Sequence, residues 1–346
     1  MPSRTFFIVA PSSIAEAGLW PRLGTGTNSG HCVIIPAHST GGTAHMQLYP
    51  LSWFDDAANG YTLIKTVPLA SAMGAEIRGV NLADLSDAQF DQVKSALWRY
   101  KMIYFRDQNL TLEDQERLTL RFGEFGTDAY TKGSPGHPNV QHLLKEASTV
   151  VDRVFGEGWH TDSPFLKQPP GVSILYGKDV PPYGGDTWWC NTEVAYDFLS
   201  PGMKKLLEGL RVHMTAREAI RMTVRKDEYG NPIVGDMEIV MESQHEILKG
   251  NFHPLVRTHP ETGRKALFVD QIYAQGIEGL TEEEAHPLLD FLGRHVTREE
   301  FSCRLRWSSG TLVMWDNRQV VHKAFNDYDG LRREMYRTIV NGEVPF

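Results

Sequence analysis

The sequence predicts a mainly β protein with helical insertions, organised around a β-sandwich core. The first observation is a series of short apolar runs, rich in β-branched and aromatic residues and bounded by Gly, Pro, Asn or Asp. The runs expected to form strands are 172–176, 266–269, 301–307, 311–315 and 336–340. The second observation is that segments with helical spacing are few and begin early. This mixture favours a β-sandwich to which helices have been added.

The first ordered elements are expected after residue 61. Residues 86–98 begin with Ser86 as an N-cap and carry apolar residues at helical spacing, which predicts a helix. The apolar run at 102–105 that follows predicts a short strand. Thr111 and Asp114 then form a capping arrangement before a second helix, which ends near Gly123.

Two further helices are expected later in the chain. The first covers about 192–210 and is interrupted near Pro201, because proline cannot donate the hydrogen bond that a helix interior requires. The second covers 281–296, where Thr281 and Glu284 have the spacing of a capping box.

Composition and charge exclude several classes of protein. The 346 residues are 41% hydrophobic and 23% charged, which is ordinary for a globular chain and not for a disordered one. A net charge of −8 without long Lys/Arg blocks argues against nucleic-acid binding. No apolar stretch approaches the roughly 18 residues of a membrane span. The short apolar run at the N-terminus and the three cysteines fit a protein of the reducing cytoplasm.

The chain divides into an N-terminal extension at 1–60 and a single domain at 61–346. The extension is expected to be partly irregular, because it holds Gly/Ser/Thr clusters at 24–30 and 39–43 and shows no sustained period. Gly24 and Gly26 superficially resemble a phosphate-binding loop. No strand pattern precedes them and no helix pattern follows, so we interpret them as part of a loop.

His160 and Asp162 are the first candidate metal ligands. On an extended segment, residues two apart project to the same face, so one imidazole and one carboxylate can bind a single ion. A third ligand is needed, and His322 in the C-terminal part of the chain is the candidate. Two histidines and one carboxylate with open positions are the ligand set of non-haem Fe(II) oxygenases.

The His-x-acid spacing alone carries little information. With 13 histidines and 43 acidic residues, roughly 1.6 such pairs are expected by chance. The chain has two, and the second joins His259 to Glu261 in the turn-like stretch 258–263. We therefore expect His259 to be an exposed loop histidine.

The segment after His322 adds a second feature. A turn at 327–330 reverses the chain into a β-rich strand, on which Arg333, Met335, Arg337 and Ile339 alternate onto one face. Two guanidinium groups directed into a sandwich interior are costly without anionic partners. A ligand with a carboxylate would satisfy them through paired hydrogen bonds.

Together these residues resemble the family of taurine dioxygenase and 2,4-dichlorophenoxyacetate dioxygenase (TauD/TfdA), whose members are Fe(II)- and 2-oxoglutarate-dependent dioxygenases. The resemblance covers about 61–343 and rests on five motifs in the right order. The motifs are 102–108, 121–124, 159–165, 184–187 and the C-terminal segment 315–340. It implies a double-stranded β-helix (jelly roll) with helical insertions.

The resemblance also implies roles for individual residues. The catalytic iron would be bound by His160, Asp162 and His322. Thr187 and Arg333, the latter eleven residues after the last histidine, would hold the distal carboxylate of the cosubstrate 2-oxoglutarate. Arg337 matches a second arginine on the substrate side, which favours a small anionic organic substrate.

The implied reaction consumes O₂ and 2-oxoglutarate, releases succinate and CO₂, and hydroxylates a small organic acid beside a heteroatom. Segments 251–260 and 263–270 are most similar to the aryloxyalkanoate (phenoxypropionate) branch, where such hydroxylation cleaves an ether. A taurine, alkylsulfonate or alkyl sulfate dioxygenase of the same family is the alternative. Asp128 stands where taurine-type enzymes have a sulfonate-contacting histidine, and Gly156 where they have an asparagine, so both argue against taurine.

Two alternatives from other classes stay open. Two histidines and one aspartate also suit a zinc-dependent hydrolase, and a jelly roll can be a non-catalytic binding module. Thr187 and Arg333 discriminate, because a hydrolase has no need of a 2-oxoglutarate clamp. Relatives of this kind are often homo-oligomers, which is a further expectation.

Overall fold

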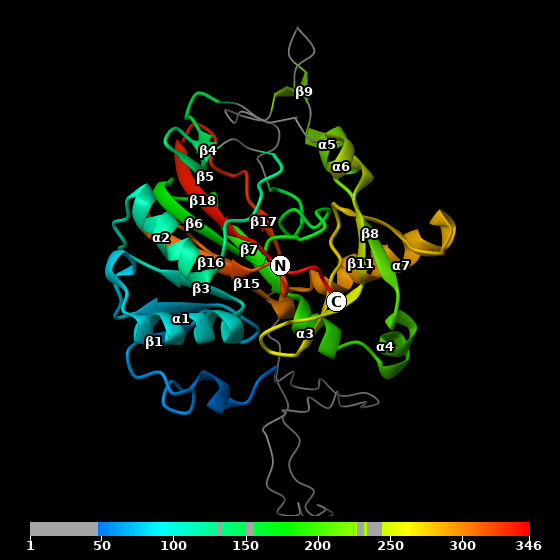
Figure 1. Ribbon diagram of the computed structural model, residues 1–346, viewed down its shortest axis with the longest axis horizontal. Helices are drawn as coiled ribbons and strands as arrows, with labels where there is room; N and C mark the ends of the chain where they lie inside the picture. The colour runs from blue at the N-terminus through cyan, green and yellow to red at the C-terminus, as the bar shows by residue number, and fades with distance from the viewer. Residues whose placement is uncertain (1–47, 131–132, 150–155, 224, 227–231, 234–243) are drawn as a thin grey trace, which may run out of the picture. The chain divides into compact units, whose positions relative to one another are not determined.

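The computed structural model describes residues 48–130, 133–149, 156–223, 225–226, 232–233 and 244–346. These residues form a mainly β structure with helical insertions, as predicted (Figure 1). Most of the expected N-terminal extension, residues 1–47, lies outside the described residues. Leu48 and Tyr49, which begin the described part, are buried in the core, and Tyr49 stacks on Trp53.

The largest sheet has eight strands, and all but one of its pairings are antiparallel. Its central strands are those that the apolar runs predicted, and they are long and buried. In spatial order the strands are β1 (Lys65–Pro68), β2 (Ala75–Arg78), β3 (Met102–Phe105), β16 (Thr311–Asp316), β6 (Val172–Asp179), β18 (Arg333–Val340), β5 (His137–Lys145) and β4 (Gly133–Ser134).

Smaller sheets complete the β structure. A three-stranded sheet consists of β15 (Ser302–Leu305), β7 (Thr187–Asn191) and β17 (Val320–Ala324). A second contains β11 (Asn251–Pro254), β8 (Arg211–Met214) and β14 (Ala274–Ile277). The two-stranded pairs are β12 (Val256–Thr258) with β13 (Lys265–Leu267), and β9 (Arg225–Lys226) with β10 (Pro232–Ile233).

Both faces of the large sheet are covered. In β16, Leu312 and Met314 point to one face, and Val313 and Trp315 point to the other. The first face packs against helix α1 (Asp87–Tyr100), and the second forms one wall of the main core. Because both faces are buried, the strand reads as a continuous apolar run, and this is why it was recognisable.

The two early helices begin where their caps predict. The side chain of Ser86 accepts a hydrogen bond from the Gln89 amide at the start of α1, and Thr111 does the same with Asp114 at the start of α2 (Leu112–Phe122). In Figure 1, both helices lie along the large sheet, and α2 contacts β18. They therefore shield one face of the sheet from water.

The two later helices that the sequence predicts are present, and two further short ones were not predicted. The expected interruption near Pro201 separates α3 (Thr192–Asp197) from α4 (Pro201–Leu207), and Pro201 occupies the first turn of α4, where no hydrogen-bond donor is needed. Thr281 and Glu284 form the expected capping box of the longest helix. That helix is α7 (Glu282–Val296). The other helices of the described residues are α5 (Arg217–Thr223) and α6 (Gln244–Lys249), with short 3₁₀ turns at Leu51–Phe54, Leu82–Asp84 and Glu299–Phe301.

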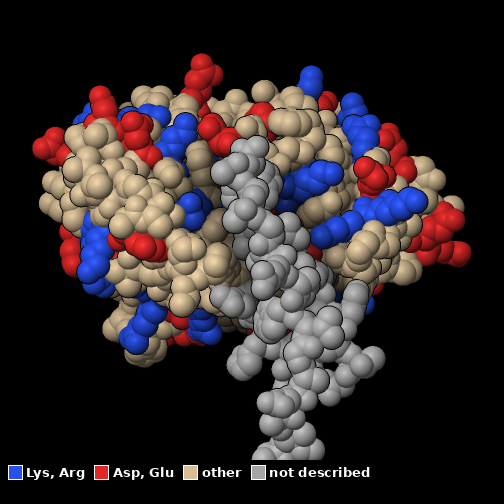
Figure 2. Space-filling view, turned by 90° about the horizontal axis from the view of Figure 1, so that it is seen from below, with Lys and Arg blue, Asp and Glu red and all other residues tan. Residues whose placement is uncertain are grey.

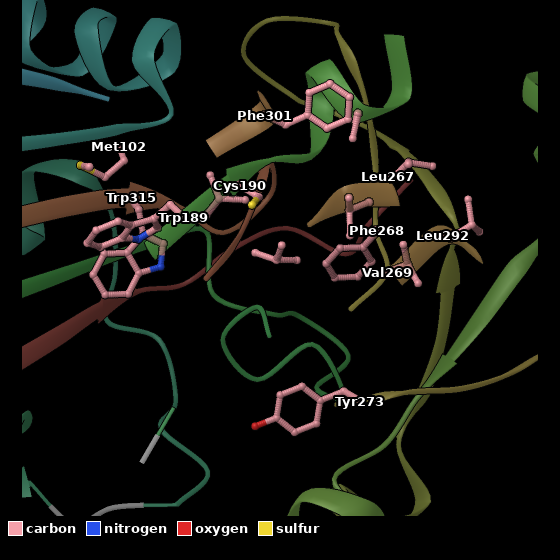
Figure 3. Packing of buried hydrophobic residues seen from close by; sticks show 14 of the residues in the cluster. Met102, Trp189, Cys190, Leu267, Phe268, Val269, Tyr273, Leu292, Phe301 and Trp315 are labelled. Atoms are coloured by element: carbon pink, nitrogen blue, oxygen red, sulfur yellow. The ribbon is translucent and has the colours of Figure 1, made fainter. Parts of the chain in front are cut away.

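The main core lies between the large sheet and the three-stranded sheet of β15, β7 and β17. Figure 3 shows Trp189 of β7 against Trp315 of β16, beside Met102 of β3. The centroids of the two indole rings are 5.9 Å apart. Tyr104 of β3 belongs to the same core and is 7% exposed. Large aromatic rings thus fill the space between the sheets.

His259 contradicts the expectation of an exposed loop residue. It is 1% exposed, and its Nε2 lies 2.7 Å from a carboxylate oxygen of Asp316. Its Nδ1 accepts hydrogen bonds from the backbone amides of Glu261 and Thr262, so the proton is on Nε2 and is donated to Asp316. The turn was predicted correctly, but its histidine is directed inward because Asp316 at the end of β16 offers a buried acceptor.

We expect His259→Ala to lower the free energy of unfolding by about 2–3 kcal/mol, because the buried Asp316 carboxylate loses a hydrogen-bond donor. Chemical denaturation of the variant measures this. His286→Ala, in an exposed position of α7, is the matched control. Its free energy of unfolding is expected to stay within about 0.5 kcal/mol of that of the unchanged protein. Equal stability of the two variants would contradict a structural role for His259.

The surface is consistent with the composition. On the face shown in Figure 2, Lys and Arg side chains are interspersed with Asp and Glu. Among the described residues, none of the helices is long and apolar enough to cross a membrane.

Candidate active site

Two backbone hydrogen bonds bring the candidate histidines together. The amide of His160 donates to the carbonyl of His322 (3.0 Å), and the amide of His322 donates to the carbonyl of His160 (2.7 Å). The two residues thus face each other as a single antiparallel β-bridge, although 161 residues separate them in the chain. Gly156, which pairs with Ala324 of β17, lies close to His160, and a Cβ there would be 3.2 Å from the imidazole Cε1.

The structure brings the three predicted metal ligands into one buried cluster. One carboxylate oxygen of Asp162, Oδ1, is 3.8 Å from Nε2 of His160 and 3.8 Å from Nε2 of His322. One ligand atom from each residue lies within 4.8 Å of the others. This geometry suits a single ion bound by two imidazoles and one carboxylate, with further positions open.

The protonation of the two imidazoles suits metal binding. Nδ1 of His160 lies 2.7 Å from the carbonyl of Gly158, which only accepts, so Nδ1 carries a proton and Nε2 is the nitrogen that faces the cluster. Burial, together with the nearby His160, lowers the pKa of His322 to about 3. His322 is therefore neutral near pH 7, which a metal ligand must be.

Asp162 is held in place by a chain of hydrogen bonds. The hydroxyl of Ser173 donates to Oδ2 of Asp162 (2.5 Å), and the side-chain amide of Asn317 donates to Ser173 (2.8 Å). The indole of Trp315 in turn donates to Asn317 (2.9 Å). Burial opposes ionisation of Asp162, but the positive charge of Arg337 and the hydrogen bond from Ser173 favour the carboxylate, and the pKa of Asp162 lies below its usual range. Oδ2 is occupied, and Oδ1 is left to face the histidines.

We expect Ser173→Ala to weaken Fe(II) binding about 10- to 100-fold, because Asp162 loses the donor that fixes its orientation. Anaerobic calorimetric titration with Fe(II) measures the dissociation constant. Ser95→Ala is the control, because Ser95 pairs with Tyr61 on the far side of the large sheet. Unchanged Fe(II) affinity in Ser173→Ala would show that the hydrogen-bond chain does not orient Asp162.

Thr187 and Arg333 are linked through Trp307. The indole of Trp307 donates to the Thr187 hydroxyl oxygen (3.0 Å), which leaves the hydroxyl hydrogen available for an anion. The guanidinium carbon of Arg333 lies 5.8 Å from the Trp307 ring and 5.9 Å from the Tyr328 ring. Two aromatic rings thus position the cation beside the end of β7.

The turn before Thr187 requires two glycines. Gly184 and Gly185 both have positive φ angles, +74° and +65°. A Cβ on Gly184 would lie 2.5 Å from the carbonyl oxygen of Asp327, and one on Gly185 would lie 3.3 Å from Nε of Arg333. A side chain at Gly184 would therefore clash with the backbone of the 327–333 segment, and one at Gly185 would crowd the Arg333 side chain.

Arg333 has the features of an anion-binding residue. Its Nε is buried and has no hydrogen-bond partner among the described residues. Its guanidinium also donates to the carbonyl of Gly185 (3.4 Å) and hydrogen-bonds the Tyr328 hydroxyl, and both of these partners are neutral. Burial lowers the pKa of Arg333, which shows that the environment opposes the charge. A carboxylate from a bound molecule would pair with the guanidinium and accept its free hydrogen bonds, and the distal carboxylate of 2-oxoglutarate fits this requirement.

Arg337 differs from Arg333 because it is already paired. Its Nη2 forms a buried ion pair with Asp128, and its Nη1 lies 3.4 Å from Oδ1 of Asp162. Asp128 is therefore at the site, as the sequence register suggested, and is in direct contact with the arginine expected to face the substrate.

Aromatic side chains lie beside this pair. The rings of Tyr130 and Tyr273 pack against Phe165 at 5.6 and 5.2 Å, and the Tyr130 hydroxyl lies 3.3 Å from that of Tyr273. Tyr273 also approaches the ring of His160 (6.4 Å), and Figure 3 shows its hydroxyl directed away from Phe268 and Val269. Phe165 is 1% exposed and packs between the two tyrosines.

The comparisons with known proteins agree with this geometry. A family model described as taurine catabolism dioxygenase TauD, TfdA family matches residues 65–339. The chain belongs to the TauD/TfdA family.

Relatives within the TauD/TfdA family act on different substrates, according to their names. The alkylsulfatase of Acinetobacter baylyi is 33% identical to this chain and covers 80% of it and 84% of its own length. The 2-oxoglutarate-dependent 2,4-dichlorophenoxyacetate dioxygenase of Cupriavidus pinatubonensis is 30% identical over 78% of this chain and 95% of its own. The crystal structure of a taurine dioxygenase from Burkholderia xenovorans superposes with a TM-score of 0.67 at 33% identity, covering 82% of this chain and 91% of that one.

TauD/TfdA proteins are dioxygenases that use Fe(II), 2-oxoglutarate and O₂, and this chain is an oxidoreductase of that kind. The hydrolase and the non-catalytic binding module are therefore set aside. The buried histidine–aspartate cluster and the unsatisfied Arg333 fit the metal and the cosubstrate that the family uses.

Sequence reasoning missed several residues of the site. Ser173, Asn317 and Trp307 all orient residues that it found, yet they lie in ordinary strand or turn contexts. Asn317 alone had a signal in the sequence, since a polar residue at the end of a buried apolar strand, here directly after β16, must find a hydrogen-bond partner. Tyr130 and Tyr273 had none, because each lies in a segment without periodicity.

Proposed function

We propose that this enzyme hydroxylates a small organic acid at a carbon next to a heteroatom, coupled to conversion of 2-oxoglutarate and O₂ to succinate and CO₂. The observations that carry the proposal are the buried cluster of His160, Asp162 and His322 and the guanidinium of Arg333, which forms no ion pair with any of the described residues. A double-stranded β-helix is the architecture that we infer for the two sheets holding these residues.

We assign Fe(II) to the two Nε2 atoms of His160 and His322 and to Oδ1 of Asp162. Bound there with 2-oxoglutarate, the iron supplies the activation of O₂. The chain orients the ligands: Gly158 fixes the tautomer of His160, and Ser173 occupies the second oxygen of Asp162.

We assign the distal carboxylate of 2-oxoglutarate to Arg333 and Thr187. The guanidinium supplies two parallel donors, and the Thr187 hydroxyl supplies a third. Trp307 and Tyr328 exclude water from the cation and strengthen its attraction for the carboxylate. The cosubstrate would thus be fixed at the end remote from the iron.

The substrate is proposed to bind between the metal and the aromatic group of Tyr130, Phe165 and Tyr273, with Arg337 facing it. The relatives named for 2,4-dichlorophenoxyacetate and for sulfate esters support a small acid with a heteroatom next to the reacting carbon. Hydroxylation beside an ether oxygen gives a hemiacetal, which collapses to an alcohol or phenol and a carbonyl product. An alkyl sulfate or sulfonate is the alternative substrate.

We also infer a cytoplasmic location, consistent with the buried, unpaired thiols of Cys190 and Cys303.

Succinate formation tests the proposal. Enzyme loaded anaerobically with Fe(II) receives 2-oxoglutarate and O₂ with each of four substrate classes: aryloxyalkanoates, sulfonates, sulfate esters and plain carboxylates. Succinate that depends on iron and rises with one class identifies that class. Iron-loaded enzyme that produces no succinate, coupled or uncoupled, would overturn the proposal.

A further inference from the structure

The ion pair between Arg337 and Asp128 is built into the interior. The Asp128 side chain is 2% exposed and the Arg337 side chain 7% exposed. The second oxygen of Asp128 accepts the backbone amide of Tyr130 at 2.7 Å. Both carboxylate oxygens are therefore engaged, and displacing Asp128 would leave a buried carboxylate without its cation.

The charges of the site balance before any substrate enters. The proposed iron carries two positive charges and 2-oxoglutarate carries two negative ones. The four ionised side chains at these ligands also cancel, as two carboxylates and two guanidinium groups: Asp128, Asp162, Arg333 and Arg337. An anionic group placed at Arg337 would leave the interior with excess negative charge, which is costly where water is excluded.

A further acid lies on the same side of the site. Asp270 accepts hydrogen bonds from the amides of Thr161, Ile272 and Tyr273, and burial raises its pKa. Any negative charge on Asp270 makes an additional anion still less favourable. The two carboxylates that pair with Arg337, those of Asp128 and Asp162, and the nearby Asp270 thus all oppose a further anion at this position.

We propose that Asp128 is a specificity-determining residue that occupies the anion position at Arg337, so that the part of the substrate facing this pair is uncharged. The inference rests on the proposed function and deepens it. An ether, amide or alcohol group meets the pair, and the acid group of an acidic substrate lies at its other end. Sulfonates and sulfates presented to Arg337 are rejected by Asp128.

Two pairs of similar shape but different charge test this: 1-butanesulfonate against 1-butanesulfonamide, and pentanoate against pentanamide. Their binding to the anaerobic Fe(II)–2-oxoglutarate enzyme is measured by calorimetry. We expect the unchanged enzyme to bind each neutral compound at least about tenfold more tightly than its anion. In Asp128→Asn, we expect the anions to gain at least about tenfold in affinity, while the neutral compounds change little.

Asp290→Asn, an exposed position in α7, is the control and should leave all four affinities unchanged. In the double variant Asp128→Asn/Arg337→Gln the gain for anions should disappear, because it depends on the freed guanidinium. Unchanged enzyme that prefers the sulfonate over the sulfonamide would overturn the proposal, even if Asp128→Asn does not fold. The visible absorption of the Fe(II)–2-oxoglutarate chelate checks the proposed function separately, because it forms without substrate.

Discussion

Asp162→Ala is expected to abolish stable Fe(II) binding and to lower iron-dependent succinate formation by at least about 10³-fold. The substitution removes the carboxylate that lies 3.8 Å from both imidazole Nε2 atoms. It also leaves the positive charge of Arg337 next to the two histidines, where it repels a cation. Metal content after anaerobic loading and gel filtration, together with succinate formation, measures both effects.

The control for this variant is Asp290→Ala, which removes an acid from an exposed face of α7. It should bind one Fe(II) and retain full turnover. Circular dichroism of Asp162→Ala checks that the fold survives, because Ser173 and Arg337 both lose a buried partner. A folded Asp162→Ala protein with normal iron content and turnover would remove Asp162 from the ligand set.

Arg333→Gln is expected to raise the KM for 2-oxoglutarate about 10²- to 10³-fold while leaving Fe(II) affinity nearly unchanged. The variant removes a cation that makes no ion pair with the described residues and whose buried Nε has no partner among them, so a carboxylate from the cosubstrate is its expected counterion. Thr187 remains as a neutral donor and retains part of the affinity. Steady-state kinetics in 2-oxoglutarate and Fe(II) titration separate the two effects.

The adjacent residue supplies a matched control. Arg332 is a third exposed and forms ion pairs with Glu146, Asp179 and Glu334 on the outer face of the strand. Arg332→Gln should therefore leave the KM for 2-oxoglutarate within about twofold, since surface ion pairs contribute little. A larger effect from Arg332 than from Arg333 would mean that the strand presents the other residue to the cosubstrate.

Much of the fold could be predicted because its signals are local. Ser86 and Thr111 cap their helices through residues three positions away, and the apolar run of β16 reflects burial of both sheet faces. The metal cluster was predictable for a different reason. Its spacing carries little information alone, and it was the order of several motifs along the chain that identified it.

The remaining features depend on contacts between distant segments. His259 was assigned to an exposed turn because nothing near it in sequence indicates Asp316, which is 57 residues away. Ser173 is an ordinary strand residue until the fold brings it to Asp162. The pairing of Arg337 with Asp128 spans 209 residues, so nothing near Arg337 in the sequence indicates that a carboxylate of the chain already pairs with it.

The backbone bridge between His160 and His322 also has a consequence for how long the protein survives without iron. A metal bound by both side chains would cross-link segments from the middle and the end of the domain and would bind only the folded chain. Mass action then adds about 2.7 kcal/mol to the free energy of unfolding when free metal reaches a hundred times its dissociation constant. Iron shortage would therefore increase the fraction of chains open to proteases, so cellular abundance of the enzyme would follow iron supply even at constant synthesis.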